Sequence, residues 1–148
     1  MTEQIITFET AKLAKVKGFP IDVCLNSYND HEKLSYNPCF VTRSFPAEYQ
    51  HFHLANLEKH ADKYAAPTQS LLQKWLREVH KLNVIVDVID NSKYYHYDYC
   101  IVNHNKREYH DEDMMDQAYR FFKWHCNHVT YEDALEEGLV NALNLIEV

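Results

Sequence analysis

The chain has 148 residues, of which 46% are hydrophobic and 25% charged, and its formal net charge is −7. This length and apolar content favour a single packed domain over residues 1–148 and exclude an intrinsically disordered chain. The two glycines, Gly18 and Gly138, lie far apart, which excludes nucleotide sites that need a glycine-rich loop against phosphate.

The first half of the chain contains one clear helix signal and three weaker segments. A helix is predicted over residues 7–17, where basic residues gather near the end and Gly18 supplies the stop. Residues 21–28 are predicted as a strand, and 34–41 as a weaker strand because an Asn-Pro pair interrupts it. The modest apolar spacing over 47–64 indicates a helix in the least determined part of the chain.

The second half carries the strongest pattern. Residues 68–80 are predicted to form a helix, because Thr68 is a good N-cap and apolar residues recur at helical spacing. This apolar stripe consists of Leu72, Trp75, Leu76 and Val79. A β-branched run, a polar turn and a tyrosine-rich run then predict a β-hairpin over 83–103. We expect the helix that carries Trp75 to pack against this hairpin.

Two further helices are predicted at the C-terminal end. Asp111 is a good cap, and the apolar spacing that follows predicts a helix over 111–125. Thr130 begins a sequence close to a capping box, which predicts a helix over 130–146. Together the elements predict an α+β fold, in which a small antiparallel sheet with a central hairpin packs against amphipathic helices.

Composition and the N-terminal sequence also suggest a compartment. No apolar run approaches the ~20 residues that a membrane span needs, and the first residues lack the pattern of a signal peptide. The four cysteines are therefore expected to be buried, reduced thiols: Cys24, Cys39, Cys100 and Cys126. We predict a cytoplasmic protein with no membrane partner.

Charge is unevenly distributed along the chain. Residues 1–107 carry 12 acidic and 13 basic side chains, whereas residues 108–148 carry 10 acidic and 2 basic ones. A protein that binds DNA or RNA needs a basic face that displaces counterions, so we expect no long nucleic acid as a partner. The carboxylates fall mainly in first turns and on solvated faces of predicted helices, which is typical of solubility rather than of DNA mimicry.

Two stretches resemble a known family. Residues 66–86 (APTQSLLQKWLREVHKLNVIV) and 131–146 (YEDALEEGLVNALNLI) are similar to blocks in a family of small uncharacterised proteins common in phages and prophages of gut Bacteroidetes. Members of that family also begin with a helix like residues 8–19, whereas residues 104–128 are longer and more acidic than the usual connection. The resemblance implies an accessory protein of a phage or mobile element that acts on host machinery or defence. It implies no catalytic residue.

The first candidate site is a set of tyrosines on the second strand of the predicted hairpin. On a strand, Tyr95, Tyr97 and Tyr99 share one face. Such a face belongs either to the core, with its hydroxyls at the rim, or to a binding surface, because tyrosine offers a large and rigid contact area. Flanked by cations, it is also suited to stacking a small nucleotide.

The second candidate is a cationic strip on the solvent side of the Trp75 helix. It consists of Lys74, Arg77 and Lys81. The strip is either ordinary solvated surface or a site for a phosphate or an acidic partner. Contact between this strip and the acidic C-terminal part of a second copy would give a homodimer.

The third candidate is a group of histidines after the predicted 111–125 helix. His125, Cys126 and His128 are residue types that bind zinc, but a second ligand pair is missing, so metal binding stays open. Histidines that favour the negative end of a helix dipole explain the same pattern.

These observations lead to one main hypothesis and two alternatives. The main hypothesis is a non-enzymatic phage-type accessory protein that needs no cofactor and binds a host protein in the host cytoplasm, as in counter-defence. The first alternative is a small-ligand binder, such as a nucleotide sponge, that stacks its ligand on the tyrosines and holds phosphate with the cationic strip. The second alternative is a metal-dependent hydrolase built on the histidine group.

Overall fold

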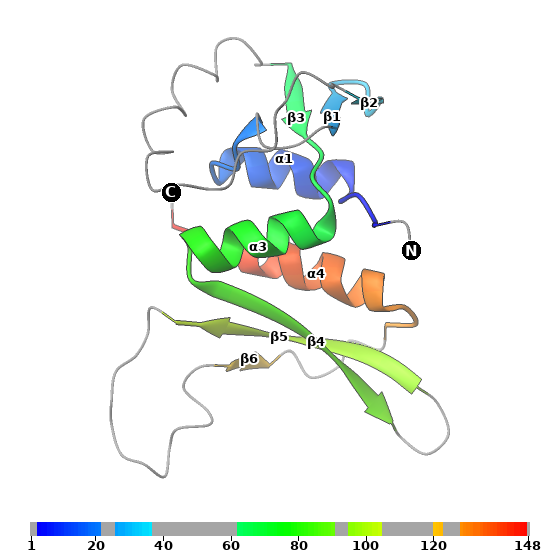
Figure 1. Cartoon of the computed structure of the whole chain (residues 1–148), viewed down its shortest axis with the longest axis vertical. Coiled ribbons are helices and arrows are strands. Elements are labelled where there is room, and N and C mark those ends of the chain that lie inside the picture. Colours follow the sequence, from blue (N-terminus) through cyan, green and yellow to red (C-terminus); the bar gives the residue numbers. More distant parts are fainter. Residues whose placement is uncertain are drawn as a thin grey trace.

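A computed structural model describes residues 3–21, 26–36, 62–90, 95–104, 120–122 and 128–147. Three helices and six strands are found in these ranges (Figure 1). In chain order they are α1 (Phe8–Val16), β1 (Asn26–Asn29), β2 (Leu34–Tyr36), β3 (Lys63–Ala65), α3 (Gln69–Val79), β4 (Leu82–Asp90), β5 (Tyr95–Asn103), β6 (Arg120–Phe122) and α4 (Tyr131–Asn144).

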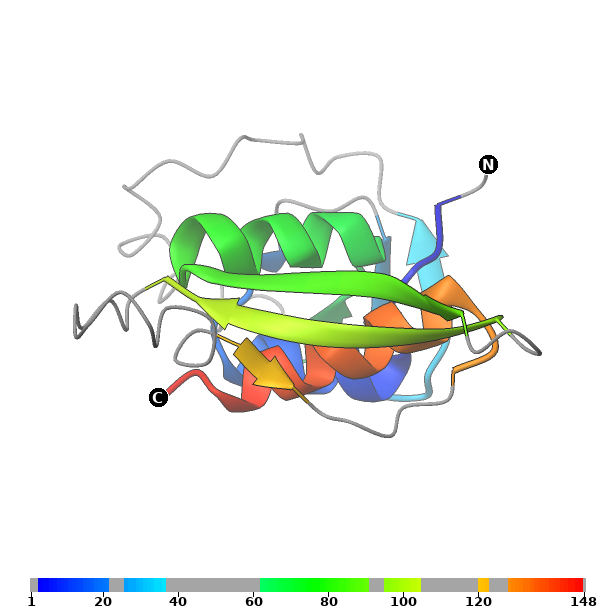
Figure 2. The same cartoon turned by 90° about the horizontal axis from the view of Figure 1, so that it is seen from below.

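The elements form layers around a helical centre. Helices α3 and α4 cover one face of an antiparallel sheet with the order β4-β5-β6, which Figure 2 shows from its other side. Helix α1 packs on α4 from the side away from this sheet, and a smaller antiparallel sheet with the order β2-β1-β3 completes the stack (Figure 1). The predicted α+β fold with antiparallel sheets is therefore confirmed.

The predicted hairpin and the helix before it meet as expected. Strands β4 and β5 pair over their full lengths, with Val84 opposite Ile101 and Val86 opposite Tyr99. Helix α3 packs on β4, and Leu72, Trp75 and Leu76 of the predicted stripe are buried, whereas Val79 at the end of the helix is 50% exposed. The buried side chains between the helices and this sheet include Leu72, Leu76, Leu82, Val84, Tyr99, Ile101, Leu135, Leu139 and Leu143.

Helix α4 approaches the hairpin closely at Gly138, the one glycine inside a described helix. A Cβ atom there would lie 2.6 Å from Val84 Cγ1 and 3.0 Å from a ring carbon of Tyr99. Those distances are shorter than ordinary van der Waals contact, so a side chain at this position would push the helix and the sheet apart. Glycine therefore sets the spacing between α4 and the hairpin.

The three predicted helix starts are confirmed by their caps. The hydroxyls of Thr7, Thr68 and Thr130 accept hydrogen bonds from the backbone N–H groups of Thr10, Leu71 and Asp133. These bonds satisfy N–H groups that have no partner inside the helix. After α1 the chain turns at Gly18, whose φ of 90° lies in the left-handed region that glycine adopts at little cost.

Two predicted helices are wrong where the structure describes them. The prediction over 111–125 fails at residues 120–122, which form β6 and pair with β5. The prediction over 47–64 fails at residues 63–64, which belong to β3 and pair with β1. In both places, the neighbouring strand offers backbone partners that local helical spacing does not reveal. Asp62 lies in a turn, and the other residues of these predicted helices lie outside the described ranges.

The two predicted N-terminal strands are recovered only in part. The strand expected over 21–28 begins at Asn26, and Ile21 lies in a short 3₁₀ turn. The strand expected over 34–41 is seen as β2, and residues 37–41 fall outside the described ranges. In the ranges that are described, no helix combines the length and the apolar character needed to cross a bilayer.

Candidate functional site

The three tyrosines of β5 do not form one uniform surface. Tyr99 is only 4% exposed, Tyr97 is half-buried, and Tyr95 is 75% exposed. The gradient follows the footprint of α4, which covers the Tyr99 region and begins beside Tyr97 (Figure 1). Tyr99 is thus a core residue, whereas Tyr95 extends past the helices into solvent.

Apolar residues gather at this end of the hairpin, and we call this group the hairpin-end patch. Val88 lies opposite Tyr97 in the β4–β5 register, so the two side chains share a sheet face. The ring of Tyr97 packs edge-on against Tyr131 on α4, with centroids 6.2 Å apart. Five residues form the patch: Val88, Tyr95, Tyr97, Val129 and Tyr131.

The hairpin-end patch is unusually exposed for apolar side chains. Val129 is 84% exposed, Val88 51% and Tyr131 43%. With Tyr95, these residues account for four of the ten large apolar side chains that are exposed in the described part of the chain. Scattered exposed apolar residues are normal in proteins, whereas their concentration at one end of the hairpin favours an interaction surface.

A polar cluster holds the segment before α4 in place and so positions this patch. The backbone of His128 pairs with that of Tyr97, with N···O distances of 2.9 and 3.3 Å. His128 Nε2 lies 3.1 Å from Glu137 Oε2, and the Tyr99 hydroxyl donates to Glu137 Oε1 at 3.4 Å. The amide of Asn141 donates to the Tyr99 oxygen. Val129 and Tyr131 follow His128 directly, so the cluster fixes where they emerge.

The predicted metal group is only partly visible. His128 lies in the polar cluster just described, and its observed side-chain partner is a carboxylate of α4. His125 and Cys126 lie outside the described residues. Among the residues that are described, no group of three or more histidine, cysteine or acidic side chains is arranged to hold a metal ion. Cys100 is half-buried on β5 as a thiol, and the other three cysteines lie outside the described ranges.

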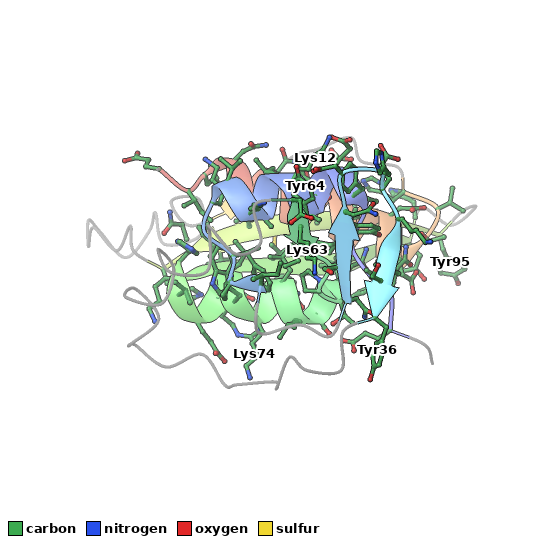
Figure 3. All side chains as sticks on the ribbon, turned by 90° about the horizontal axis from the view of Figure 1, so that it is seen from above. Lys12, Tyr36, Lys63, Tyr64, Lys74 and Tyr95 are labelled. Carbon is green, nitrogen blue, oxygen red and sulfur yellow. The ribbon has the colours of Figure 1, made fainter. Side chains whose placement is uncertain are left out.

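The cationic strip lies on α3 and in the turn that follows it. Lys74, Arg77 and Lys81 are all exposed. The Lys74 ammonium lies 3.9 Å from a carboxylate oxygen of Glu78, and the Lys81 ammonium donates to the Glu78 carbonyl oxygen at 2.8 Å. Lys74 and Tyr95 point away from the molecule in different directions (Figure 3). The structure does not bring the strip and the tyrosines into one site.

A second polar cluster joins the three helices and was not predicted. Glu136 accepts hydrogen bonds from the Thr7 N–H at 2.8 Å, the Thr10 hydroxyl at 2.6 Å and the Gln69 amide at 2.9 Å. Burial, and to a lesser degree the charge of Glu136, raises the pKa of Tyr28. The observed hydrogen-bond partners of Glu136 all belong to the fold itself, so the Glu136 carboxylate is a structural link between α1, α3 and α4.

Glu137 and Asn141 were missed because their role depends on tertiary contacts. They are four residues apart on α4 and therefore share a helix face, which the sequence alone does indicate. The sequence does not indicate that β5 lies against this face.

Comparison of the chain with protein families, curated proteins and solved structures finds no match. Functional interpretation therefore depends on the site itself.

Proposed function

We propose that this chain is a non-enzymatic binding protein that attaches to another protein through the hairpin-end patch. The observation that carries the proposal is the exposure of Tyr95, Val129, Val88 and Tyr131 around Tyr97, which lies opposite Val88 and packs against Tyr131. Exposed tyrosines supply large contact area and lose little conformational entropy on binding. Backbone pairing and α4 hold this surface in a set shape, which lowers the cost of association.

The resemblance of residues 66–86 and 131–146 to phage and prophage proteins supports a more specific form of the proposal. In that form, the chain is an accessory protein of phage type, acts in the host cytoplasm and binds a host protein in counter-defence. The nucleotide alternative has less support, because Tyr95 and Lys74 lie on different sides of the molecule (Figure 3).

A paired capture experiment tests the proposal. The wild-type chain and a Tyr95→Ser/Val129→Ser variant are immobilised and exposed to a lysate of a gut Bacteroidetes host. The matched control is Tyr36→Ser, because Tyr36 on β2 is 66% exposed and lies outside the patch. We expect at least one host protein to be retained by the wild type and by the control but not by the patch variant. Capture that does not depend on the patch, or no capture, would contradict the proposal.

A further inference from the structure

Carboxylates border the hairpin-end patch at the start of α4. Glu132 and Asp133 directly follow Tyr131 in the first turn of α4, and both are exposed. On the hairpin, Asp87 and Asp98 lie opposite each other in the register, on the sheet face opposite to that of Val88 and Tyr97. Like charges placed directly across two strands destabilise a sheet, so this arrangement is not explained by hairpin stability.

Local structure accounts for part of this charge but leaves it unneutralised. Glu132 and Asp133 interact favourably with the positive end of the α4 dipole. Asp87 and Asp98 each accept a hydrogen bond from the next backbone N–H, at 2.8 Å. Within the described part of the chain, however, none of these four carboxylates lies in an ion pair with a lysine or arginine.

The composition of the surrounding segments explains why. Residues 82–90, 95–104 and 128–147 contain eight acidic residues and no lysine or arginine. Cations are concentrated on other elements, as with Lys12 and Lys15 on α1. The described strands of the hairpin and α4 are thus acidic, and the apolar patch lies on them, whereas Lys93, between the two strands in the sequence, lies outside the described residues.

We infer that the segment occupying the hairpin-end patch is a cationic peptide segment of a protein, with lysine or arginine beside an aromatic or aliphatic anchor. The apolar anchor covers Val88 and Val129, and the cations reach the carboxylates of Glu132 and Asp133. The exposed rings of Tyr95 and Tyr131 add a second attraction, because cations bind aromatic faces. This inference rests on the proposed function, since both concern the same patch. A phosphorylated or acidic segment would be repelled.

The inference predicts a binding reaction that weakens with salt. Exposed charges separated by more than a Debye length are screened, and that length falls from about 10 Å at 0.1 M salt to about 3 Å at 1 M. Binding through apolar contacts alone is not weakened by added salt. Salt dependence therefore separates the cationic partner from a purely apolar one.

The test uses a displayed library of short random peptides, panned on the full-length chain at low salt. Selected peptides are synthesised, and their affinities are measured by fluorescence anisotropy for the wild type and for the variants. We expect the peptides to be enriched in lysine and arginine beside an apolar residue. We also expect Glu132→Gln/Asp133→Asn to weaken binding about three- to tenfold, the loss expected from two exposed ion pairs. The matched control is Glu78→Gln/Glu147→Gln, which removes two exposed charges at the opposite end of α3 and α4.

The outcomes separate the two claims. One result would overturn the inference and leave the proposed function intact. In that result, the selected peptides need Tyr95 for binding but carry no excess of cations, and they bind the Glu132→Gln/Asp133→Asn variant as tightly as the wild type. Peptides that never depend on Tyr95 would overturn both. Sedimentation velocity gives a third result: self-association that Tyr95→Ser abolishes would place a second copy of the chain on the patch and overturn the cationic peptide.

Discussion

The contact at Gly138 makes a sharp prediction about stability. In an exposed helix, Gly→Ala stabilises by about 1 kcal/mol, because alanine loses less backbone entropy on folding. Here the new methyl group would lie 2.6 Å from Val84 Cγ1 and 3.0 Å from the Tyr99 ring. Excess volume in a packed core costs about 1–3 kcal/mol. We therefore expect Gly138→Ala to lower the free energy of unfolding by about 1 kcal/mol, the difference between these two effects.

Urea denaturation followed by circular dichroism measures this change, and a double-mutant cycle identifies its cause. Val84 is only 1% exposed, so Val84→Ala alone leaves a cavity and destabilises the fold. In that background, the methyl group introduced by Gly138→Ala no longer meets Val84 Cγ1 and keeps only its contact with the Tyr99 ring, so the substitution is expected to destabilise less than in the wild type. If Gly138→Ala stabilises the wild type by the full helix-propensity gain, α4 does not lie as close to the hairpin as described, and the reasoning fails.

Two further predictions concern stability away from the patch. Glu136→Ala removes the acceptor for three donors on α1 and α3, so we expect the free energy of unfolding to fall by about 2–3 kcal/mol in thermal unfolding experiments. A loss no larger than that of an ordinary surface substitution would contradict the linking role of Glu136. Burial lowers the pKa of His80 in the folded chain. As the pH falls, His80 is therefore protonated in the unfolded chain at a higher pH than in the folded chain. The stability that neutral His80 contributes is complete above the usual histidine pKa of about 6.5 and is lost below it. His80→Phe keeps a ring against Trp75 and is expected to flatten the decline of stability between neutral and acidic pH; an unchanged pH profile would disprove this.

The elements whose causes are local can be predicted from the amino-acid sequence. Threonine caps, the Leu72–Trp75–Leu76 stripe and the β-branched run after it specify α1, α3, α4 and the central hairpin with few neighbours involved. Caps and apolar periodicity involve residues that are close in the chain. An apolar helix face packs against whichever apolar surface covers it, so its burial can be expected before its partner is known. For this reason the expected packing of the Trp75 helix on the hairpin is also found.

The residues of the candidate site are brought together by contacts between distant parts of the chain. The sequence placed Tyr95, Tyr97 and Tyr99 on one face, but the length and position of α4 over that face bury Tyr99 and leave Tyr95 exposed. Val129 and Tyr131 join the site because the backbone of His128 pairs with β5, a contact between residues about thirty positions apart. The same cause explains β6 and β3, where pairing with a distant strand replaces the predicted helix. Burial and strand pairing depend on which segments meet in space, and periodicity along the chain does not contain that information.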